Sequence, residues 1–263
     1  MKISILQMPA VLGRPADNID TLRRMAYTAM DKRPDVLLMP ELWDLGFYPT
    51  PIADFADKNG ERIRKELSDL AAKYQVNIVG GSCAISIGKN IYNTSFVFDR
   101  NGSLISSYRK THLFSPAGED KDFTAGTNFP TFVLDGVKCA TVICYDIRFP
   151  ELVRQLALKD ISVLFVPAAW PAGRLMHWDT LLRARAIENQ IFVCAANGIG
   201  KSTDDFLMGG HSSIIDPWGE ILAQASSDHK DGEIIHANLK LAIRDQIRES
   251  LPIYDDRRPE LYK

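Results

Sequence analysis

Cys144 stands where a reactive thiol would be well placed. It lies in the segment TVICYDIRFPEL (141–152), after apolar residues that suit the end of a buried strand and before FPE (149–151), which is typical of a helix start. A thiol on such a strand-to-helix corner is held rigidly by the sheet and opens to a crevice, so Cys144 is a candidate nucleophile. The alternative is a buried structural cysteine, the commoner fate of this residue type.

A glutamate follows a second strand-like segment, DVLLMPEL (35–42). Residues 36–39 form an apolar run that is too short for a helix and suits a strand buried on both faces. Pro40 has no amide hydrogen, so the strand should stop there and present Glu41 at its carboxyl end, where open α/β sheets place their ligand sites. Such a carboxylate could act as a general base. A solvated carboxylate at the start of a loop is the alternative.

The third candidate is Lys110, in SYRKTHLF (107–114). It comes where strand 103–109 ends, and a turn at 99–102 joins that strand to strand 91–98 as a hairpin. A lysine fixed there could stabilise the negative charge that develops on a carbonyl oxygen during amide hydrolysis. Because lysines are mostly exposed, a surface lysine is the alternative.

Together these residues and their surroundings resemble the carbon–nitrogen hydrolases of the nitrilase superfamily. Glu41 in LMPEL, Lys110 in YRKTHLF and Cys144 in ICYDIRFPEL match the Glu-Lys-Cys triad of that family. Further matching segments are GGS (80–82), YNTSFVF (92–98), PAAWP (167–171), HWDTLLRARAIENQ (177–190), GHSSIIDPWGE (210–220) and the final RRPELYK. The resemblance covers essentially the whole chain. Within the superfamily it points to the Nit-type ω-amidases, which include bacterial 2-oxoglutaramate amidases.

The resemblance implies an α/β fold of the nitrilase type, a four-layer α-β-β-α sandwich. It implies a cysteine-dependent hydrolase of non-peptide carbon–nitrogen bonds that needs no metal and no organic cofactor. The expected reaction is the release of ammonia from a dicarboxylate monoamide such as 2-oxoglutaramate, through a thioester on Cys144. A nitrilase or an N-carbamoyl amino acid amidohydrolase of the same superfamily stays open as an alternative.

Relatives of this kind carry a second glutamate that positions the triad, in the loop after the lysine. Glu119, within SPAGEDKDFTAG (115–126), is the best match, with Asp120 and Asp122 close by. A mobile acidic loop is the alternative. The backbone amide of Tyr145 is expected to join the lysine in holding the oxyanion.

Substrate binding is assigned to residues near the nucleophile. ω-Amidases use an arginine four residues past the cysteine for the acidic end of the substrate, which carries this role to Arg148. A structural bridge from Arg148 to Asp146 or Glu151 is the alternative. Further candidates for the pocket are Arg174, Trp170 and Phe114.

Two other classes of protein are alternatives to an amide hydrolase. Residues 195–202, AANGIGKS, follow the strand-like IFVCAA and fit a relaxed phosphate-binding P-loop pattern. A nucleotide-binding protein would need a helix directly after residue 202, whereas the sequence continues with TDD (203–205). The other alternative is a catalytically inactive binding module, and the intact triad argues against it.

Composition agrees with one soluble enzyme domain. Hydrophobic residues make up 46% and charged residues 24% of the 263, which are ordinary globular values. The net charge of −2 without a basic run argues against a nucleic-acid partner. No apolar stretch approaches the length that crosses a bilayer, and the first residues enter a strand without a signal-peptide core. Four cysteines without framework spacing predict reduced thiols in a cytoplasm, and scattered histidines argue against a zinc site.

The periodicity predicts one domain over residues 1–263, with strands and helices in alternation. The expected strands are 2–8, 36–39, 77–81, 91–98, 103–109, 131–134, 137–143, 162–166, 191–196, a hairpin over 211–224, and 233–239. The expected helices are 17–32, opened by Asp17 as the cap, 60–74, 150–158 and 176–190. Relatives dimerise, which implies a homodimer whose interface the last ~15 residues cross as a tail.

Overall fold

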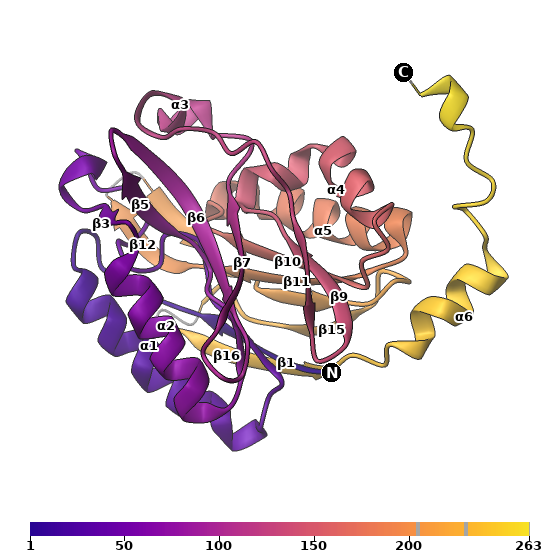
Figure 1. Cartoon of the computed structure of the whole chain (residues 1–263), viewed down its shortest axis with the longest axis horizontal. Helices are drawn as coiled ribbons and strands as arrows, with labels where there is room; N and C mark the ends of the chain where they lie inside the picture. Colours follow the sequence, from indigo (N-terminus) through magenta and orange to yellow (C-terminus); the bar gives the residue numbers. More distant parts are fainter. Residues whose placement is uncertain (204–205, 229–230, 263) are drawn as a thin grey trace.

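Two β-sheets lie face to face in the computed structural model, which describes residues 1–203, 206–228 and 231–262 (Figure 1). The eight-stranded sheet has β7 (Leu104–Arg109) paired to β6, and its other strands run in the order β16 (Glu233–Asn238), β1 (Lys2–Gln7), β2 (Val36–Leu38), β4 (Asn77–Val79), β6 (Asn90–Phe98), β5 (Cys83–Ile87) and β3 (Asp57–Lys58). The six-stranded sheet runs in the order β15 (Ile221–Gln224), β14 (Ser213–Ile215), β11 (Phe192–Asn197), β10 (Val163–Ala168), β9 (Val137–Thr141) and β8 (Thr131–Leu134).

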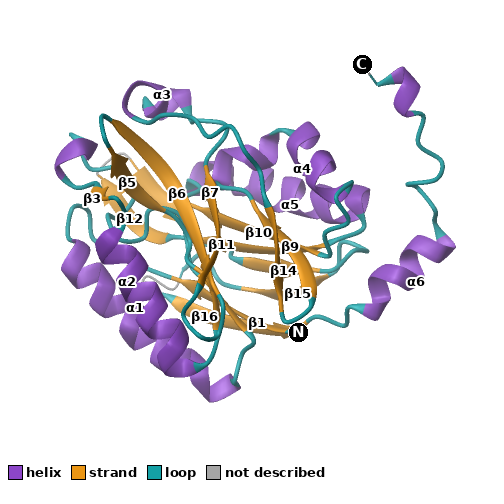
Figure 2. Cartoon of the chain, in the orientation of Figure 1, coloured by secondary structure: helices purple, strands orange, loops and turns teal. Residues whose placement is uncertain are grey.

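Helices cover the outer face of each sheet (Figure 2). The α-helices are α1 (Pro15–Ala29), α2 (Glu61–Tyr74), α3 (Glu119–Asp122), α4 (Pro150–Ala157), α5 (Leu175–Asn189) and α6 (Ala242–Ser250). Short 3₁₀ turns occupy Met30–Lys32, Ile52–Asp54, Ser115–Ala117, Cys144–Arg148, Ala172–Arg174 and Pro259–Leu261. A separate antiparallel hairpin is made by β12 (Ile199–Thr203) and β13 (Phe206–Gly209).

Apolar side chains fill the three interfaces between the four layers of helices and sheets. Side chains of β1, β2, β10 and β11 fill the space between the sheets, among them Ile3, Leu38, Phe165 and Phe192. Leu22 of α1 and Leu67 of α2 pack on the eight-stranded sheet, and Leu156 of α4 and Leu182 of α5 pack on the six-stranded sheet. These positions are fully buried, as the continuous apolar runs of the sequence require. The predicted α-β-β-α sandwich is confirmed.

Parallel strands at the centre of both sheets deliver the candidate residues to one place. β1, β2 and β4 are parallel, as are β9, β10 and β11. Glu41 follows β2 and Cys144 follows β9, so both stand beyond carboxyl strand ends, where α/β sheets bind ligands. The amide of Glu41 donates to the carbonyl of Ala168 at the end of β10 (3.2 Å), which joins the loops of the two sheets.

The first helix begins earlier than predicted. α1 starts at Pro15, whose missing amide hydrogen costs nothing in the first turn, and Arg14 occupies the cap position. Asp17 is therefore not the cap. It lies in the first turn, where its negative charge interacts favourably with the helix dipole. Its carboxylate also pairs with Arg14 (Nε–Oδ2 3.0 Å).

The predicted strands and helices do not include β3, β5, α3, the β12–β13 hairpin or α6. The hairpin decides the P-loop alternative, because β11 is followed through the AANGIGKS segment by strand β12 and not by a helix. No helix amino terminus follows Ser202 to face a phosphate, so that alternative is wrong for the described part of the segment. Asp204 and Asp205, which entered the argument, lie outside the described residues.

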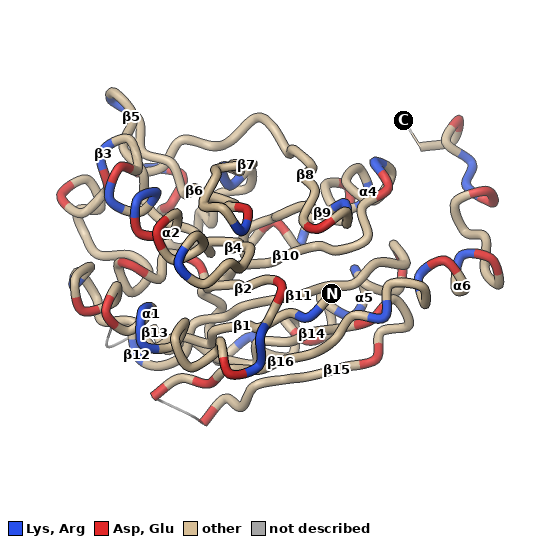
Figure 3. The backbone as a smooth tube through the Cα atoms, turned by 60° about the horizontal axis from the view of Figure 1, so that its bottom comes forward, with Lys and Arg blue, Asp and Glu red and all other residues tan. Residues whose placement is uncertain are grey.

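The carboxyl-terminal segment, which contains α6, lies to the side of the sandwich, beyond α4 and α5 (Figure 1). Arg248 of α6 pairs with Asp160 (Nη1–Oδ1 2.8 Å), and the hydroxyl of Tyr254 donates to the carbonyl of Asn189 (2.6 Å). Beyond Tyr254 the chain is largely exposed. α1, α2 and α6 each carry charges of both signs (Figure 3). Of the helices in the described residues, none combines the length and apolar character needed to span a bilayer.

We expect Gly81→Ala to destabilise the fold more than the matched substitution Gly88→Ala. Both glycines have positive φ (+64° and +60°), so an alanine at either position destabilises the folded backbone by roughly 1–2 kcal/mol. A Cβ at Gly88 meets open space, whereas at Gly81 it would lie 2.1 Å from the carbonyl oxygen of Pro40, the residue before Glu41. Urea unfolding should show an additional loss of about 1–3 kcal/mol for Gly81→Ala. Equal losses would contradict this account of the turn.

Candidate active site

Cys144 sits on a strained corner that a buried aspartate holds in place. Its φ is +46°, in the left-handed region that side chains with a Cβ rarely adopt. The carboxylate of Asp146 accepts hydrogen bonds from the Ile143 amide (2.9 Å), the Tyr108 hydroxyl (2.6 Å) and the His112 amide (2.9 Å). Strain of this kind persists only where the surroundings fix it, and it concentrates at functional sites. The sequence prediction of a rigid strand-to-helix corner is confirmed.

Lys110 places its ammonium between two buried carboxylates. Nζ lies 2.7 Å from Oε1 of Glu41 and 2.8 Å from Oε2 of Glu119. All three side chains are at most 1% exposed. The amide of Phe114 donates to Oε2 of Glu119 (2.7 Å) and fixes that carboxylate. The surface-lysine and mobile-loop alternatives are therefore wrong.

The two oxygens of Glu41 have different partners. Oε1 accepts from Lys110 and from the side-chain amide of Asn93 (2.8 Å), while Oε2 accepts from the backbone amide of Ala169 (2.9 Å). The backbone of Ala169 also lies close enough to Cys144 to lower the pKa of its thiol. A carboxylate oxygen has two lone pairs, so Oε2 keeps one for a further donor on the side of Cys144.

Burial and charge set the protonation of the group. Burial raises the pKa of the Cys144 thiol well above its usual range, and the charge of Glu41 adds to the rise, which Lys110 only partly opposes. Burial alone would lower the pKa of Lys110, but the charges of Glu119 and Glu41 raise it well above its usual value. Burial also raises the pKa of Glu119 against the opposing effect of Lys110. The free enzyme thus holds a neutral thiol beside a charged ammonium.

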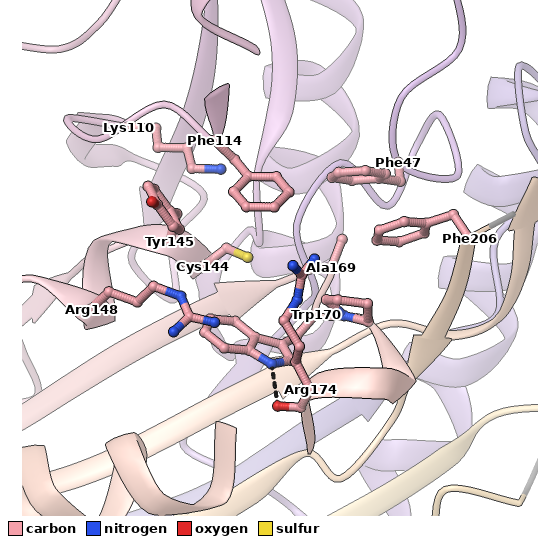
Figure 4. Close-up of a pocket in the computed structure, with 11 residues that line it drawn as sticks. Phe47, Lys110, Phe114, Cys144, Tyr145, Arg148, Ala169, Trp170, Arg174 and Phe206 are labelled. Carbon is pink, nitrogen blue, oxygen red and sulfur yellow. Dashed lines mark hydrogen bonds between the residues drawn. The ribbon is translucent and has the colours of Figure 1, made fainter. Parts of the chain in front are cut away.

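Cys144 and Lys110 line a pocket with about 320 Å³ of empty space, which includes open solvent. Figure 4 shows the residues around it. Its wall contains the predicted residues Phe114, Tyr145, Arg148, Trp170 and Arg174. Glu41 and Glu119 do not line it, because both reach Lys110 from the buried side. All nine predicted site residues therefore meet in one region.

Two arginines of this wall lack an acidic partner. The guanidinium of Arg148 lies 4.5 Å from the centre of the Trp170 ring, and that of Arg174 lies 5.2 Å from the Phe114 ring. Within the described residues neither arginine forms an ion pair, so the predicted alternative of an Arg148 bridge to Asp146 or Glu151 is wrong. Burial lowers the pKa of Arg148, and the nearby charge of Arg174 lowers it further.

Sequence reasoning missed several residues of this region. The sequence places Asn93 only within the segment YNTSFVF that matches the family, yet its side-chain amide donates to Glu41 and its carbonyl accepts from the Lys110 amide (2.9 Å). Phe47 and Phe206 line the pocket but have no local signal, since an aromatic residue in a loop or short strand is as often core. Only the fold brings these positions to the site.

The described residues contain no cluster of three histidine, cysteine or acidic side chains that could hold a metal ion. The four cysteines are free and buried. The groups that the structure brings to the site are the thiol, the two carboxylates and the ammonium, with the arginines beside them.

Comparison with known proteins agrees with this arrangement. The family model of the carbon-nitrogen hydrolases matches residues 2–249. This chain belongs to the carbon-nitrogen hydrolase family. The chain is accordingly a carbon–nitrogen hydrolase.

Three relatives illustrate the similarity of this carbon–nitrogen hydrolase to known proteins. It is 42% identical over 260 residues to the 2-oxoglutaramate amidase of Bacillus subtilis (strain 168), covering 99% of this chain and 98% of the relative. It is 32% identical over 259 residues to Omega-amidase NIT2 of Danio rerio, covering 94% and 91%. A glutamate-to-glutamine variant of the amidase from Nesterenkonia sp. AN1 has a TM-score of 0.83 at 25% identity, covering 97% and 99%. That structure shows addition of acrylamide at its active-site cysteine.

Proposed function

We propose that this carbon–nitrogen hydrolase is an ω-amidase, which releases ammonia from a short dicarboxylate monoamide such as 2-oxoglutaramate. The observation that carries the proposal is the pair of arginines without an acidic partner among the described residues, Arg148 and Arg174, in the same pocket as Cys144 and Lys110. Two converging cations without a carboxylate of their own favour an acidic substrate. Relatives named 2-oxoglutaramate amidase and omega-amidase support the choice.

The first step is attack by Cys144 on the amide carbon. The thiol is neutral at rest, so its proton passes to Oε2 of Glu41 as the sulfur–carbon bond forms. The carbonyl oxygen then carries a full negative charge, which Nζ of Lys110 stabilises, together with the backbone amide of Tyr145. One such donor is typically worth about a hundredfold to a thousandfold in rate.

Collapse of the tetrahedral intermediate completes acylation. Glu41 returns the proton to the nitrogen, the carbon–nitrogen bond breaks, ammonia leaves, and a thioester remains on Cys144. A water molecule then gives its proton to Glu41 and attacks the thioester, which releases the acid and restores the thiol. Glu119 keeps Lys110 in position throughout, and Asn93 orients Glu41.

Substrate selection follows from the pocket wall. A carboxylate at the far end of the acyl chain is expected to bind Arg148, with Arg174 as a second cation close by. Trp170 and Phe114 flank the arginines, so the chain between the two polar ends contacts aromatic surface.

Wild-type enzyme is expected to hydrolyse 2-oxoglutaramate or glutaramate faster, by kcat/KM, than acetamide, a nitrile or an N-carbamoyl amino acid. Arg148→Met should raise KM for the acidic amides at least about tenfold, because a charge-assisted hydrogen bond is worth about 1.5–3 kcal/mol. Turnover of uncharged acetamide serves as the internal control and should change little. Preference for a nitrile or an N-carbamoyl compound over every acidic amide would overturn the proposed substrate class.

We also infer that the chain is a single domain over residues 1–263 that works as a homodimer in the cytoplasm. The exposed tail beyond Tyr254 supports a partner subunit, since it carries Leu261 and Tyr262 at 63% and 60% exposure. Four free thiols suit a reducing compartment, which cell fractionation would test.

The mass of the protein in solution tests the proposed dimer directly. Light scattering after gel filtration of the full chain should give twice the 29.4 kDa mass of one subunit. Replacing Leu261 and Tyr262 by serine together should shift the equilibrium toward the monomer. A wild-type protein that stays monomeric at micromolar concentration would contradict the inference.

A further inference from the structure

Phe47 holds an unusual backbone conformation at the pocket wall. Its φ is +94°, a costly value for a bulky side chain. The amides of Leu45, Gly46 and Phe47 all donate to the carbonyl of Leu42, at 3.0, 3.0 and 3.3 Å, which winds the chain tightly after Glu41. Strain that the surroundings preserve at a pocket wall points to a requirement for that side chain in that position.

The loop that carries Phe47 is fixed from two sides. A Cβ on Gly46 would lie 2.7 Å from backbone atoms of Val11 and Leu12, so the loop packs directly on the chain after β1. The carbonyl of Gly46 accepts a hydrogen bond from the hydroxyl of Ser202 in β12. The β12–β13 hairpin is thus fastened to the loop that begins with Glu41.

The hairpin contributes the second ring. Phe206 opens β13 and stacks on Phe47, with ring centres 4.6 Å apart and planes inclined by 14°. Both rings line the pocket (Figure 4). In that view they lie together at one end, Arg148 lies at the other, and Cys144 lies between them.

The buried position of Glu41 decides which part of the substrate meets this wall. Glu41 is 1% exposed and outside the pocket wall, so an amide nitrogen that takes its proton must face inward, away from the open volume. With the amide held at Cys144 and the carboxylate at Arg148, an acyl chain longer than the direct path between them must bow toward the opposite end of the pocket, which Phe47 and Phe206 close. Because the two phenyl rings offer no hydrogen-bond partner, they bound that chain by shape alone.

We propose that the stacked pair Phe47–Phe206 is the size-limiting wall of the acyl site and determines selectivity for short dicarboxylate monoamides over longer ones. The inference rests on the proposed function and deepens it. Truncating Phe206 removes the ring that lies over Phe47 and opens the pocket toward the hairpin. Each additional methylene that the enlarged site accepts is worth about tenfold or more in discrimination.

The test compares kcat/KM for glutaramate, adipamate and suberamate in wild type, Phe206→Ala and Phe206→Leu. Phe129→Ala is the matched control, because Phe129 is also a half-buried phenylalanine but lies outside the pocket. In Phe206→Ala the ratio of suberamate to glutaramate should rise at least about tenfold over wild type, with a smaller rise in Phe206→Leu. The control variant should keep the wild-type ratio.

Two results separate the wall from the proposed function. If wild type hydrolyses the monoamides but the ratio in Phe206→Ala and Phe206→Leu equals that of wild type, the size-limiting wall is wrong while the ω-amidase proposal stands. If wild type hydrolyses none of the three monoamides, the proposed function itself fails. Should Phe206→Ala not fold, the ratio in Phe206→Leu alone decides, because leucine keeps most of the apolar contact.

Discussion

One buried ammonium governs the site. Lys110 lies between Glu41 and Glu119 with all three side chains out of water, and either carboxylate alone would be costly to bury in charged form. Its positive charge compensates both buried carboxylates. They lie beside the Cys144 thiol, whose pKa is raised by burial. The same charge faces the pocket, where the proposed chemistry creates an oxyanion. Stability and catalysis therefore depend on one interaction.

The sandwich supplies the precision that this interaction needs. The eight-stranded sheet positions Glu41 after β2 and Lys110 after β7, and the six-stranded sheet positions Cys144 after β9. Contacts between loops of the two sheets, such as the Ala169 amide on Glu41, make the site a product of the packing between them. Asp146 on the cysteine corner and Asn93 on Glu41 fix the remaining freedom of the two side chains.

Residues at the ends of predictable strands could be found from sequence. Glu41, Lys110 and Cys144 each follow an apolar or alternating run, and the family resemblance supplied Glu119 and Arg148. Asn93 could not be found, because its contact with Glu41 spans 52 positions and its own segment reads only as a strand. Phe47 and Phe206 escaped for a similar reason, since their stacking depends on an unpredicted hairpin and a positive φ. The prediction of Asp17 as the helix cap was wrong because the helix starts two residues earlier, at Pro15.

A double-mutant cycle on Lys110 and Glu119 tests the central interaction most directly. Urea unfolding of Lys110→Met should show a loss of about 3–5 kcal/mol, because two carboxylates are left buried without their cation. Adding Glu119→Gln should recover at least about 1 kcal/mol of that loss, since one uncompensated charge disappears. Losses that simply add in the double variant would contradict the account, because they would mean that the ammonium does not compensate Glu119.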